Sequence, residues 1–356
     1  MYIEKEGYNY EDVLMIPNES TSISSRSEVN LEVKYHFKYS KKIWSGVPII
    51  AANMYGVGTI EMMNILYRYK MMTMLHKFYS IEELSNAFSF NSFDNSNDTA
   101  HSYNQLEKLR YTIISTGIQQ KDILKTEELY QNFPGIFPPF ICIDIANGHM
   151  KRLLEIVESA RNIVGDSITI IAGNVATSEA TDNLIKAGAD IVKVGIGPGS
   201  HCTTRNMTGI GVPQLTAVYN CAKKAHALNA HIISDGGIKE IGDIGKAFGV
   251  GADFVMLGGM LAGHKESEEE LEIINDSPYL PFYGMSSEEA MKRSYGEVND
   301  YRASEGSFDY IPYKGSVEKT VKNILGGLRS TCSYLDCENL SDVRYEAKFM
   351  KVRSIK

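Results

Sequence analysis

Eight short apolar runs, most of them rich in β-forming residues, recur along the chain and constrain its fold more than any other feature. They occupy residues 47–54, 71–77, 111–116, 139–146, 168–176, 190–197, 231–237 and 253–259. Their hydrophobicity is nearly continuous rather than alternating, which indicates strands buried on both faces, as in a parallel sheet. Helical stretches such as KRLLEIVESARNIV separate them. Eight strand–helix units predict a (β/α)8 barrel, with an open doubly wound sheet as the alternative.

The 356 residues suffice for one such barrel, and two segments stand outside its rhythm. Residues 263–315 separate the eighth run from a final helical stretch, and a long excursion at this end of a barrel is typical of a lid or binding element. Residues 91–104 are polar and turn-rich, which predicts a surface loop or a mobile insertion. We therefore expect one catalytic barrel domain over residues 1–356, with a lid-like excursion.

Charge and composition narrow the class of protein. The net charge of −8 argues against nucleic acid as the main partner. No apolar run reaches the roughly 18 residues of a membrane-spanning helix, and the N-terminal stretch lacks the apolar segment of a signal peptide. The five cysteines show no metal-type spacing, which favours reduced thiols; they are Cys142, Cys202, Cys221, Cys332 and Cys337. We expect a cytoplasmic protein with no membrane or nucleic-acid partner.

Polar side chains gather where the apolar runs end. Asn53, Lys77, Asp144, Asn174 and Asp235 each stand near the end of a different run. In a barrel these C-terminal strand ends meet on one face, which carries the active site in characterised (β/α)8 enzymes. Glycines also punctuate strand ends for purely structural reasons, but polar residues at so many ends favour a site.

Two Gly-Gly pairs, in SDGGI and MLGGM, follow the seventh and eighth runs. Barrels frequently bind phosphate at these two loops, where backbone N–H groups point at the anion. Asp235 repels a phosphate but suits a ribose hydroxyl, so the pairs and the carboxylate together favour a nucleotide. Tight structural turns are the alternative, and a flavin phosphate is a further one.

The stretch GIGPGSHCTTR, residues 195–205, combines a glycine-rich turn with a cysteine. Converging carbonyls in such a turn suit a monovalent cation. Cys202 is a nucleophile if a positive charge, such as that of Arg205, favours its thiolate; otherwise it is a packed, inert thiol. The residues leave both readings open, whereas we expect none of the other four cysteines to be a nucleophile. Thr204 relays a proton only with a partner, and Glu305 is a candidate, although spacing alone favours a solvated acid.

Several longer motifs carry a family resemblance. They are GIGPGSHCTTR, SDGGI, GADFVMLGGMLAGH, FYGMSSEEAM, YRASEG, the N-terminal YNYEDVLMIP, SSRSEVNL and GVPIIAANM, and the tail ILGGLRSTCSY. With these motifs the chain resembles the IMP dehydrogenase/GMP reductase family over nearly its whole length. It is more similar to the reductases, because only a short segment follows LHKFYS, where dehydrogenases usually carry a paired regulatory (CBS) insertion. No Arg–Tyr flap pair of the dehydrogenase kind is evident either.

The resemblance implies a (β/α)8 enzyme of purine salvage that reductively deaminates GMP to IMP and ammonia with NADPH. Cys202 would attack C2 of the guanine ring to form a covalent thioimidate, and Thr204 with Glu305 would protonate the departing amine. Two alternatives remain: an NAD-dependent IMP dehydrogenase that forms XMP, and a non-catalytic nucleotide-binding relative. The three intact residues argue against the second alternative, since a pure binder needs none of them.

The resemblance also implies binding roles. GMP would be held by Asp235, Gly236, Gly237, Gly258, Gly259, Gly284, Met285, Ser286, Arg302, Ala303, Ser304, Glu305 and Gly306. The NADPH site would comprise Lys77, Asp144, Ile145, Ala146, Ile196, Gly197, Met285, Tyr301, Arg302, Ser330, Thr331, Cys332 and Ser333, with Ser25 and Arg26 of a neighbouring subunit. Carbonyls of Gly197, Gly199, Cys202 and Arg205 would bind a monovalent cation, expected to be potassium. An arginine such as Arg26 suits a 2′-phosphate, and the shared site implies a homotetramer.

Three stretches depart from the family pattern. Tyr55 stands in Met-Tyr-Gly-Val where members typically read Met-Asp-Thr-Val, so a phenol replaces a carboxylate near the expected purine pocket. His201 replaces a small apolar residue beside Cys202, and it would make activity pH-sensitive if it approached the thiol. STGIQQKD, residues 115–122, is less polar than its reductase counterpart, which puts the cofactor contacts of that loop in question.

Overall fold

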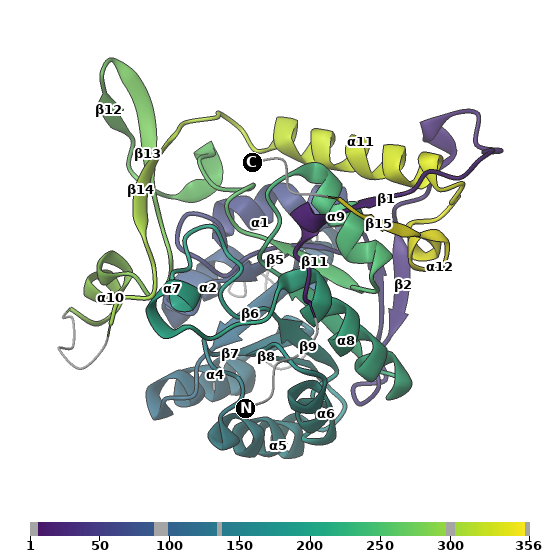
Figure 1. Ribbon diagram of the computed structural model, residues 1–356. Coiled ribbons are helices and arrows are strands. Elements are labelled where there is room, and N and C mark those ends of the chain that lie inside the picture. Colours follow the sequence, from purple (N-terminus) through teal and green to yellow (C-terminus); the bar gives the residue numbers. More distant parts are fainter. Residues whose placement is uncertain (1–5, 89–98, 134–136, 297–302, 353–356) are drawn as a thin grey trace.

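A closed barrel of eight parallel strands forms the centre of the protein in the computed structural model (Figure 1). The structure describes residues 6–88, 99–133, 137–296 and 303–352. Around the barrel the strands are β4 (Ile49–Ala51), β5 (Met72–Leu75), β6 (Thr112–Thr116), β7 (Phe140–Asp144), β8 (Thr169–Val175), β9 (Ile191–Val194), β10 (His231–Asp235) and β11 (Phe254–Leu257). Each predicted run contains one barrel strand, so the (β/α)8 fold is confirmed and the open sheet is excluded.

Helices between the strands cover the outside of the barrel (Figure 1). They are α1 (Ile60–Leu66), α2 (Ile81–Phe88), α3 (Thr99–Arg110), α4 (Gln120–Asn132), α5 (Lys151–Val164), α6 (Ser178–Lys186), α8 (Gln214–Ala227), α9 (Ile241–Gly249) and α11 (Glu318–Tyr334). Every residue of β6 and β8 is buried, as their continuous hydrophobicity predicts. None of the helices in the described ranges is both long and apolar enough to cross a membrane.

The polar segment 91–104 is only partly as predicted. Helix α3 begins at Thr99, so the last six residues of the segment are helical, and residues 91–98 lie outside the described ranges. The helix is favoured by its later residues, where Leu109 packs in a buried cluster with Leu84 and Phe88. Packing of an apolar face stabilises a helix more than the propensity of its first residues does, which is why composition alone missed it.

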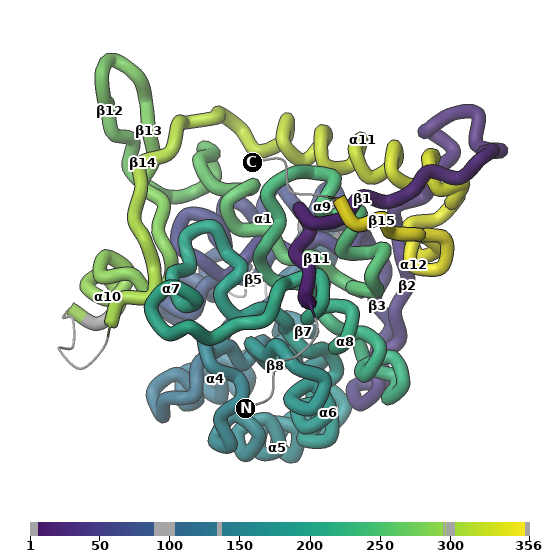
Figure 2. Tube along the Cα trace, viewed as in Figure 1, coloured from purple at the N-terminus to yellow at the C-terminus, as the bar shows by residue number. Residues whose placement is uncertain are grey.

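The long excursion after β11 does lie outside the barrel. It contains the 3₁₀ helix η5 (Lys265–Ser267), β12 (Glu272–Ile274), β13 (Ser277–Tyr283), α10 (Glu288–Tyr295) and β14 (Phe308–Pro312). The three strands form an antiparallel sheet that projects from one side of the molecule (Figure 1). Elsewhere, segments from near the two ends of the chain lie side by side, because β1 (Val13–Met15) pairs with β15 (Phe349–Lys351) (Figure 2).

The antiparallel pair β2 (Val33–His36) and β3 (Ile43–Gly46) packs at the end of the barrel where the strands begin, with Tyr35 against Phe254 and Phe37 against Phe140. Next to it the buried carboxylate of Asp253 lies 2.9 Å from His226, 3.2 Å from His231 and 3.7 Å from Arg344. Burial raises the pKa of Asp253, but the histidines outweigh it and hold the pKa well below its usual range. A charge cluster at this end of a barrel is typical of a structural role.

Candidate active site

The loop after β9 presents Cys202 at the end of the barrel where the strands finish. Its Sγ lies 3.2 Å from the Oγ1 of Thr204, and that hydroxyl donates to Oε2 of Glu305 at 2.6 Å. Thr204 opens the short helix α7 (Thr204–Thr208), whereas Glu305 comes from the excursion, 101 residues further along the chain. The fold therefore connects three side chains that spacing alone could not join.

The direction of these hydrogen bonds follows from the groups involved. Thr204 has a single hydroxyl hydrogen, and it is donated to Glu305. The oxygen of Thr204 is then left to accept the thiol hydrogen of Cys202. All three residues are half-buried, so the chain of hydrogen bonds is partly shielded from water. The arrangement can pass a proton from the thiol to the carboxylate and back.

Two glycines let the excursion come this close to the loop that carries Cys202. A Cβ at Gly284 would lie 2.6 Å from the backbone oxygen of His201, and a Cβ at Gly306 would lie 3.1 Å from the Cα of Gly284. With no side chains in the way, Gly306 pairs with Cys202 in an antiparallel bridge. Glu305, the residue before this bridge, is thereby aimed at the loop.

The glycines predicted to hold phosphate pack against the same loop. A Cβ at Gly236 would lie 2.9 Å from the Pro198 ring, and a Cβ at Gly259 would lie 3.2 Å from the hydroxyl of Ser200. Gly236 and Gly237 have φ values of +87° and +80°, a region that favours glycine. The ends of β10 and β11 thus converge on the turn that precedes Cys202.

The carbonyls predicted to hold a monovalent cation all belong to this turn and to α7. Gly197 has a φ of +78°, and the side chain of Arg205 packs over it. The Gly199 carbonyl accepts from the nitrogen of Cys202 at 3.1 Å, and the Arg205 carbonyl accepts from that of Gly209 at 3.0 Å. Each carbonyl oxygen has a second lone pair, so both can still ligate. Neutral carbonyls are the donor set that suits potassium, and the carbonyls of Gly199 and Arg205 keep a lone pair for such an ion.

The guanidinium of Arg205, expected to favour the thiolate, points at the backbone instead. Its Nε donates to the carbonyl of Ile196 at 3.3 Å, and a terminal nitrogen donates to that of Val212 at 2.6 Å. Burial lowers the pKa of Arg205 below its usual value, although the nearby Cys202 thiol opposes this effect. Holding the turn in shape is thus the role that its contacts show.

A buried ion network, whose central lysine the sequence pattern did not single out, lies below this face. Lys193 of β9 is 4% exposed, and its Nζ lies 2.9 Å from Asp144 Oδ1 and 3.0 Å from Asp235 Oδ2. Asn53 donates to Asp144 Oδ2 at 2.7 Å, and Asn174 donates to Asp235 Oδ2 at 2.8 Å. Burial lowers the pKa of Lys193, but the carboxylates raise it well above its usual value. The available signal was a lysine inside the apolar run DIVKVGIG.

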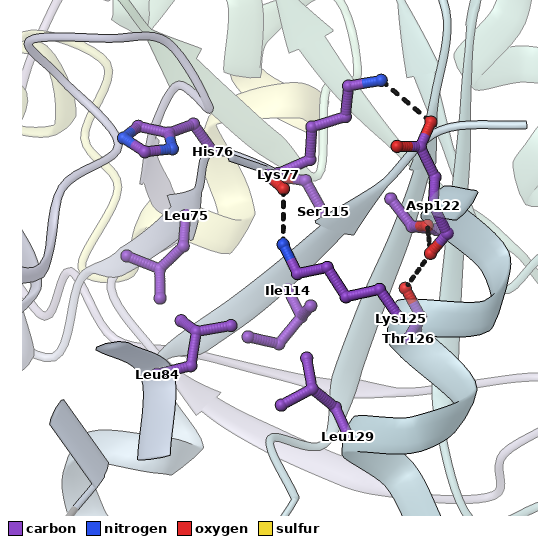
Figure 3. Close-up of a pocket in the computed structure, with 11 residues that line it drawn as sticks. Leu75, His76, Lys77, Leu84, Ile114, Ser115, Asp122, Lys125, Thr126 and Leu129 are labelled. Carbon is purple, nitrogen blue, oxygen red and sulfur yellow. Dashed lines mark hydrogen bonds and ion pairs between the residues drawn. The ribbon is translucent and has the colours of Figure 1, made fainter. Parts of the chain in front are cut away.

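Lys77, expected to contact NADPH, borders a small cavity between β5, β6 and α4 (Figure 3). Its Nζ pairs with Asp122 at 3.0 Å, and its carbonyl accepts from Lys125 at 2.7 Å. The cavity holds about 10 Å³, room for roughly one water molecule. STGIQQKD, the stretch whose cofactor contacts were in question, therefore provides an acidic partner for Lys77.

The remaining predicted ligand residues are spread over several elements. Ile145 and Ala146 directly follow β7. Met285, Ser286, Ala303 and Ser304 lie near Gly284 and Gly306, the two glycines of the excursion that approach the Cys202 loop. Ser330, Thr331 and Ser333 are half-buried on α11, but the Cys332 side chain between them is fully buried and faces the core. Ser25 and Arg26 are exposed at the 3₁₀ helix η2 (Arg26–Glu28), beside α11. Tyr301 and Arg302 lie outside the described residues.

The other cysteines are free and buried. Burial raises the pKa of Cys221 to about 11 and that of Cys332 and Cys337 to about 12, and it raises that of Cys142 well above its usual value. None has the accessible, low-pKa surroundings of a reactive thiol.

Comparison with known proteins identifies the family. The model of the IMP dehydrogenase / GMP reductase domain matches residues 7–355. The chain belongs to the IMP dehydrogenase/GMP reductase family. It is 47% identical over 343 residues to the GMP reductase of Buchnera aphidicola subsp. Acyrthosiphon pisum (strain Tuc7), across 96% of this chain and 93% of that protein. It is 48% identical over 344 residues to the GMP reductase of Escherichia coli O157:H7, across 97% and 94%. The resemblance inferred from the motifs is confirmed.

Tyr55, a departure from the pattern of the family, packs within the protein. It is 6% exposed, its ring stacks on Phe78 at 5.1 Å, and the guanidinium of Arg293 lies 4.1 Å from its centroid. Its hydroxyl lies 3.2 Å from that of Ser294. Because Arg293 and Ser294 belong to α10, the phenol fastens the excursion to the loop after β4.

His201, the second departure from the family, is turned toward the excursion. Its ring packs edge-on against Phe282 at 4.4 Å, and its Nε2 lies 3.3 Å from Asp309. Its Nδ1 lies 3.1 Å from the hydroxyl of Ser200. Among the described residues the ring therefore contacts β13 and β14. The sequence had raised the possibility of a contact between His201 and the Cys202 thiol, and the contacts of the ring do not include one.

Proposed function

We propose that the protein is an NADPH-dependent GMP reductase, which converts GMP to IMP and ammonia through a thioimidate on Cys202. The observation that carries this proposal is the hydrogen-bonded chain from Cys202 through Thr204 to Glu305. Membership of the family and the names of its relatives support the choice of reaction.

The chain of hydrogen bonds accounts for the protons of the first step. As Cys202 Sγ bonds to C2 of guanine, its proton passes through Thr204 to Glu305. The same proton returns to the exocyclic nitrogen as the C2–N bond breaks, so ammonia leaves and a thioimidate remains. One S–H and one C–N bond are exchanged for one C–S and one N–H bond. The carboxylate therefore serves first as base and then as acid.

The protein's own residues prepare the second step. When bound, NADPH supplies the hydride that replaces sulfur at C2. Lys77, Asp144, Ile145, Ala146, Ile196 and Gly197 would hold it, with Met285 and the residues of α11. The thiolate released with IMP takes up one proton from solvent, which restores the starting thiol. Lys77 suits this role because its ion pair with Asp122 holds its ammonium at the edge of the small cavity between β5, β6 and α4.

The nucleotide would lie across the converging strand ends. Asp235 Oδ2 is engaged by Lys193 and Asn174, so Oδ1 is the atom that would accept from a ribose hydroxyl. The Gly-Gly pairs 236–237 and 258–259 would offer backbone N–H groups to the phosphate. Residues 284–286 and 302–306 would close over the purine from the excursion.

We further propose a potassium ion at the carbonyls of Gly197, Gly199, Cys202 and Arg205, and a cytoplasmic homotetramer acting in purine salvage. Ser25 and Arg26 support a shared cofactor site: they are exposed, and no hydrogen bond or ion pair within the described ranges ties them to Lys77 or Asp144. A neighbouring copy would bring them to that site.

The proposal is tested by following NADPH absorbance with GMP and potassium, beside Cys202→Ser. The wild type should form IMP and ammonia in equal amounts. The serine variant should bind GMP, retain its melting temperature and oxidise no NADPH. If a folded wild type binds GMP without oxidising NADPH, the proposal is wrong. XMP formed from IMP and NAD would then indicate the dehydrogenase, and no turnover of either nucleotide would indicate a non-catalytic binder.

A further inference from the structure

We propose that Lys193 is a positioning residue that orients the carboxylates of both ligand sites and makes binding of the two ligands interdependent. The inference rests on the proposed function for the identity of the ligands, a purine nucleotide on Asp235 and a nicotinamide dinucleotide on Asp144. Neither the catalytic chain nor the expected binding residues include this lysine.

Lys193 stands between the two sites. Its ammonium is almost completely buried and contacts one oxygen of each carboxylate, at 2.9 Å and 3.0 Å. The carboxylates are more open to solvent: the side chains of Asp144 and Asp235 are 25% and 22% exposed. One buried ammonium thus forms ion pairs with both carboxylates, Asp144 at the proposed cofactor site and Asp235 at the proposed nucleotide site.

The barrel makes room for this side chain. Gly173 of β8 is the register partner of Lys193, and a Cβ there would lie 2.6 Å from the Cβ of the lysine. The strand next to Lys193 therefore carries no side chain where the lysine begins. The ammonium is then held in place by its two carboxylate partners.

The network leaves each carboxylate a defined orientation. Both oxygens of Asp144 are engaged, one by Lys193 and the other by Asn53, whereas Asp235 uses only Oδ2 among the described residues. Without the ammonium, two neighbouring carboxylates would repel each other and turn apart. The lysine would therefore leave Asp235 Oδ1 available to the nucleotide and hold Asp144 in place at the proposed cofactor site.

Sharing one cation couples the two sites. A ligand that donates a hydrogen bond to one carboxylate weakens the ion pair of that carboxylate with the ammonium. The ion pair of the ammonium with the other carboxylate changes as a consequence. Coupling between binding sites is reciprocal, so the cofactor changes the affinity for the nucleotide by the same factor as the nucleotide changes that for the cofactor. A lysine that merely neutralised buried charge would stabilise the fold without this effect.

The test compares Lys193→Met with a matched control, Lys246→Met. Lys246 is 13% exposed on α9 and pairs with Asp243 at 3.1 Å, at a position that contacts none of the proposed ligands. Calorimetry would measure the Kd of GMP alone and with saturating NADP⁺, and the Kd of NADP⁺ alone and with GMP. Steady-state assays would add kcat and both KM values.

We expect a coupling of at least about fivefold in the wild type. In Lys193→Met the Kd of each ligand should rise at least about tenfold, as loss of a charge-assisted contact implies, and the coupling should fall to about one. The control should keep every constant within about twofold. If Lys193→Met unfolds, Lys193→Met/Asp144→Asn removes one stranded carboxylate, and it should still bind GMP about tenfold more weakly.

The outcomes separate this inference from the proposed function. If the wild type reduces GMP but shows no coupling, or a folded lysine variant keeps wild-type affinities, the inference is overturned and the proposed function stands. Wild-type GMP affinity in the double variant overturns it as well. A wild type that binds no GMP overturns both.

Discussion

Replacing Glu305 with glutamine gives the sharpest test of the proton path. Glu305 Oε2 accepts from Thr204 at 2.6 Å, a short charge-assisted hydrogen bond. Glutamine has the same shape and can still accept through its carbonyl oxygen, but it cannot take up the thiol proton. The backbone contacts of residue 305 are unchanged, so the purine site should keep its form.

The magnitude follows from the role of the carboxylate. A positioned acid–base group contributes about 10²–10⁴-fold to rate, and glutamine keeps part of the polar contact, so kcat should fall about 10²–10³-fold. That loss corresponds to about 2.7–4.1 kcal/mol of transition-state stabilisation. KM for GMP should change less than about threefold, because the lost interaction acts only in the chemical step.

Thr204→Val extends this experiment, because the two hydrogen bonds act in series. Breaking either one interrupts the path, so each single variant and the double variant should lose a similar factor in kcat. NADPH oxidation under saturating GMP measures these rates, and Glu289→Gln, on the exposed first turn of α10, is the matched control. A glutamine variant within about threefold of wild type, or losses that multiply in the double variant, would refute the reasoning.

Two further predictions concern stability and loop geometry. Asp253→Asn should cost about 1–3 kcal/mol, since it removes the buried counter-charge of three partly exposed cations. Burial lowers the pKa of His231, but Asp253 raises it above its usual value. The stabilisation from this ion pair is therefore fully present below about pH 6.5 and is lost as the pH rises through the folded-state pKa of His231. Urea unfolding should thus show a larger difference at pH 5.5 than at pH 8.5, and equal differences would contradict the assignment. Gly284→Ala should lower kcat at least about tenfold, because its Cβ would press on the His201 carbonyl at 2.6 Å. Gly326→Ala, which meets nothing within 4 Å, should leave kcat unchanged, and equal rates in both variants would show that the close approach is unimportant.

The sequence predicted the barrel, with an open sheet as the alternative, and the face that carries the candidate site. Apolar runs buried on both sides indicate a parallel sheet that is covered on both faces, and all eight became strands of a closed barrel. The same logic placed Asp144 and Asp235 at strand ends. Composition predicted a loop over residues 91–104, but residues 99–104 are helical. Packing of the later residues of the helix favours it, and the composition of its first residues does not show this.

Only the tertiary structure decided which polar residues act together. Spacing left Glu305 as one solvated acid among many, since nothing local ties it to a threonine 101 residues earlier; the glycines at 284 and 306 permit that approach. Lys193 was equally hidden, because a charged residue in a buried strand has no visible partner until the barrel closes. Strand character is set by local hydrophobic pattern, whereas a site depends on side chains that meet only after distant strands and loops have packed.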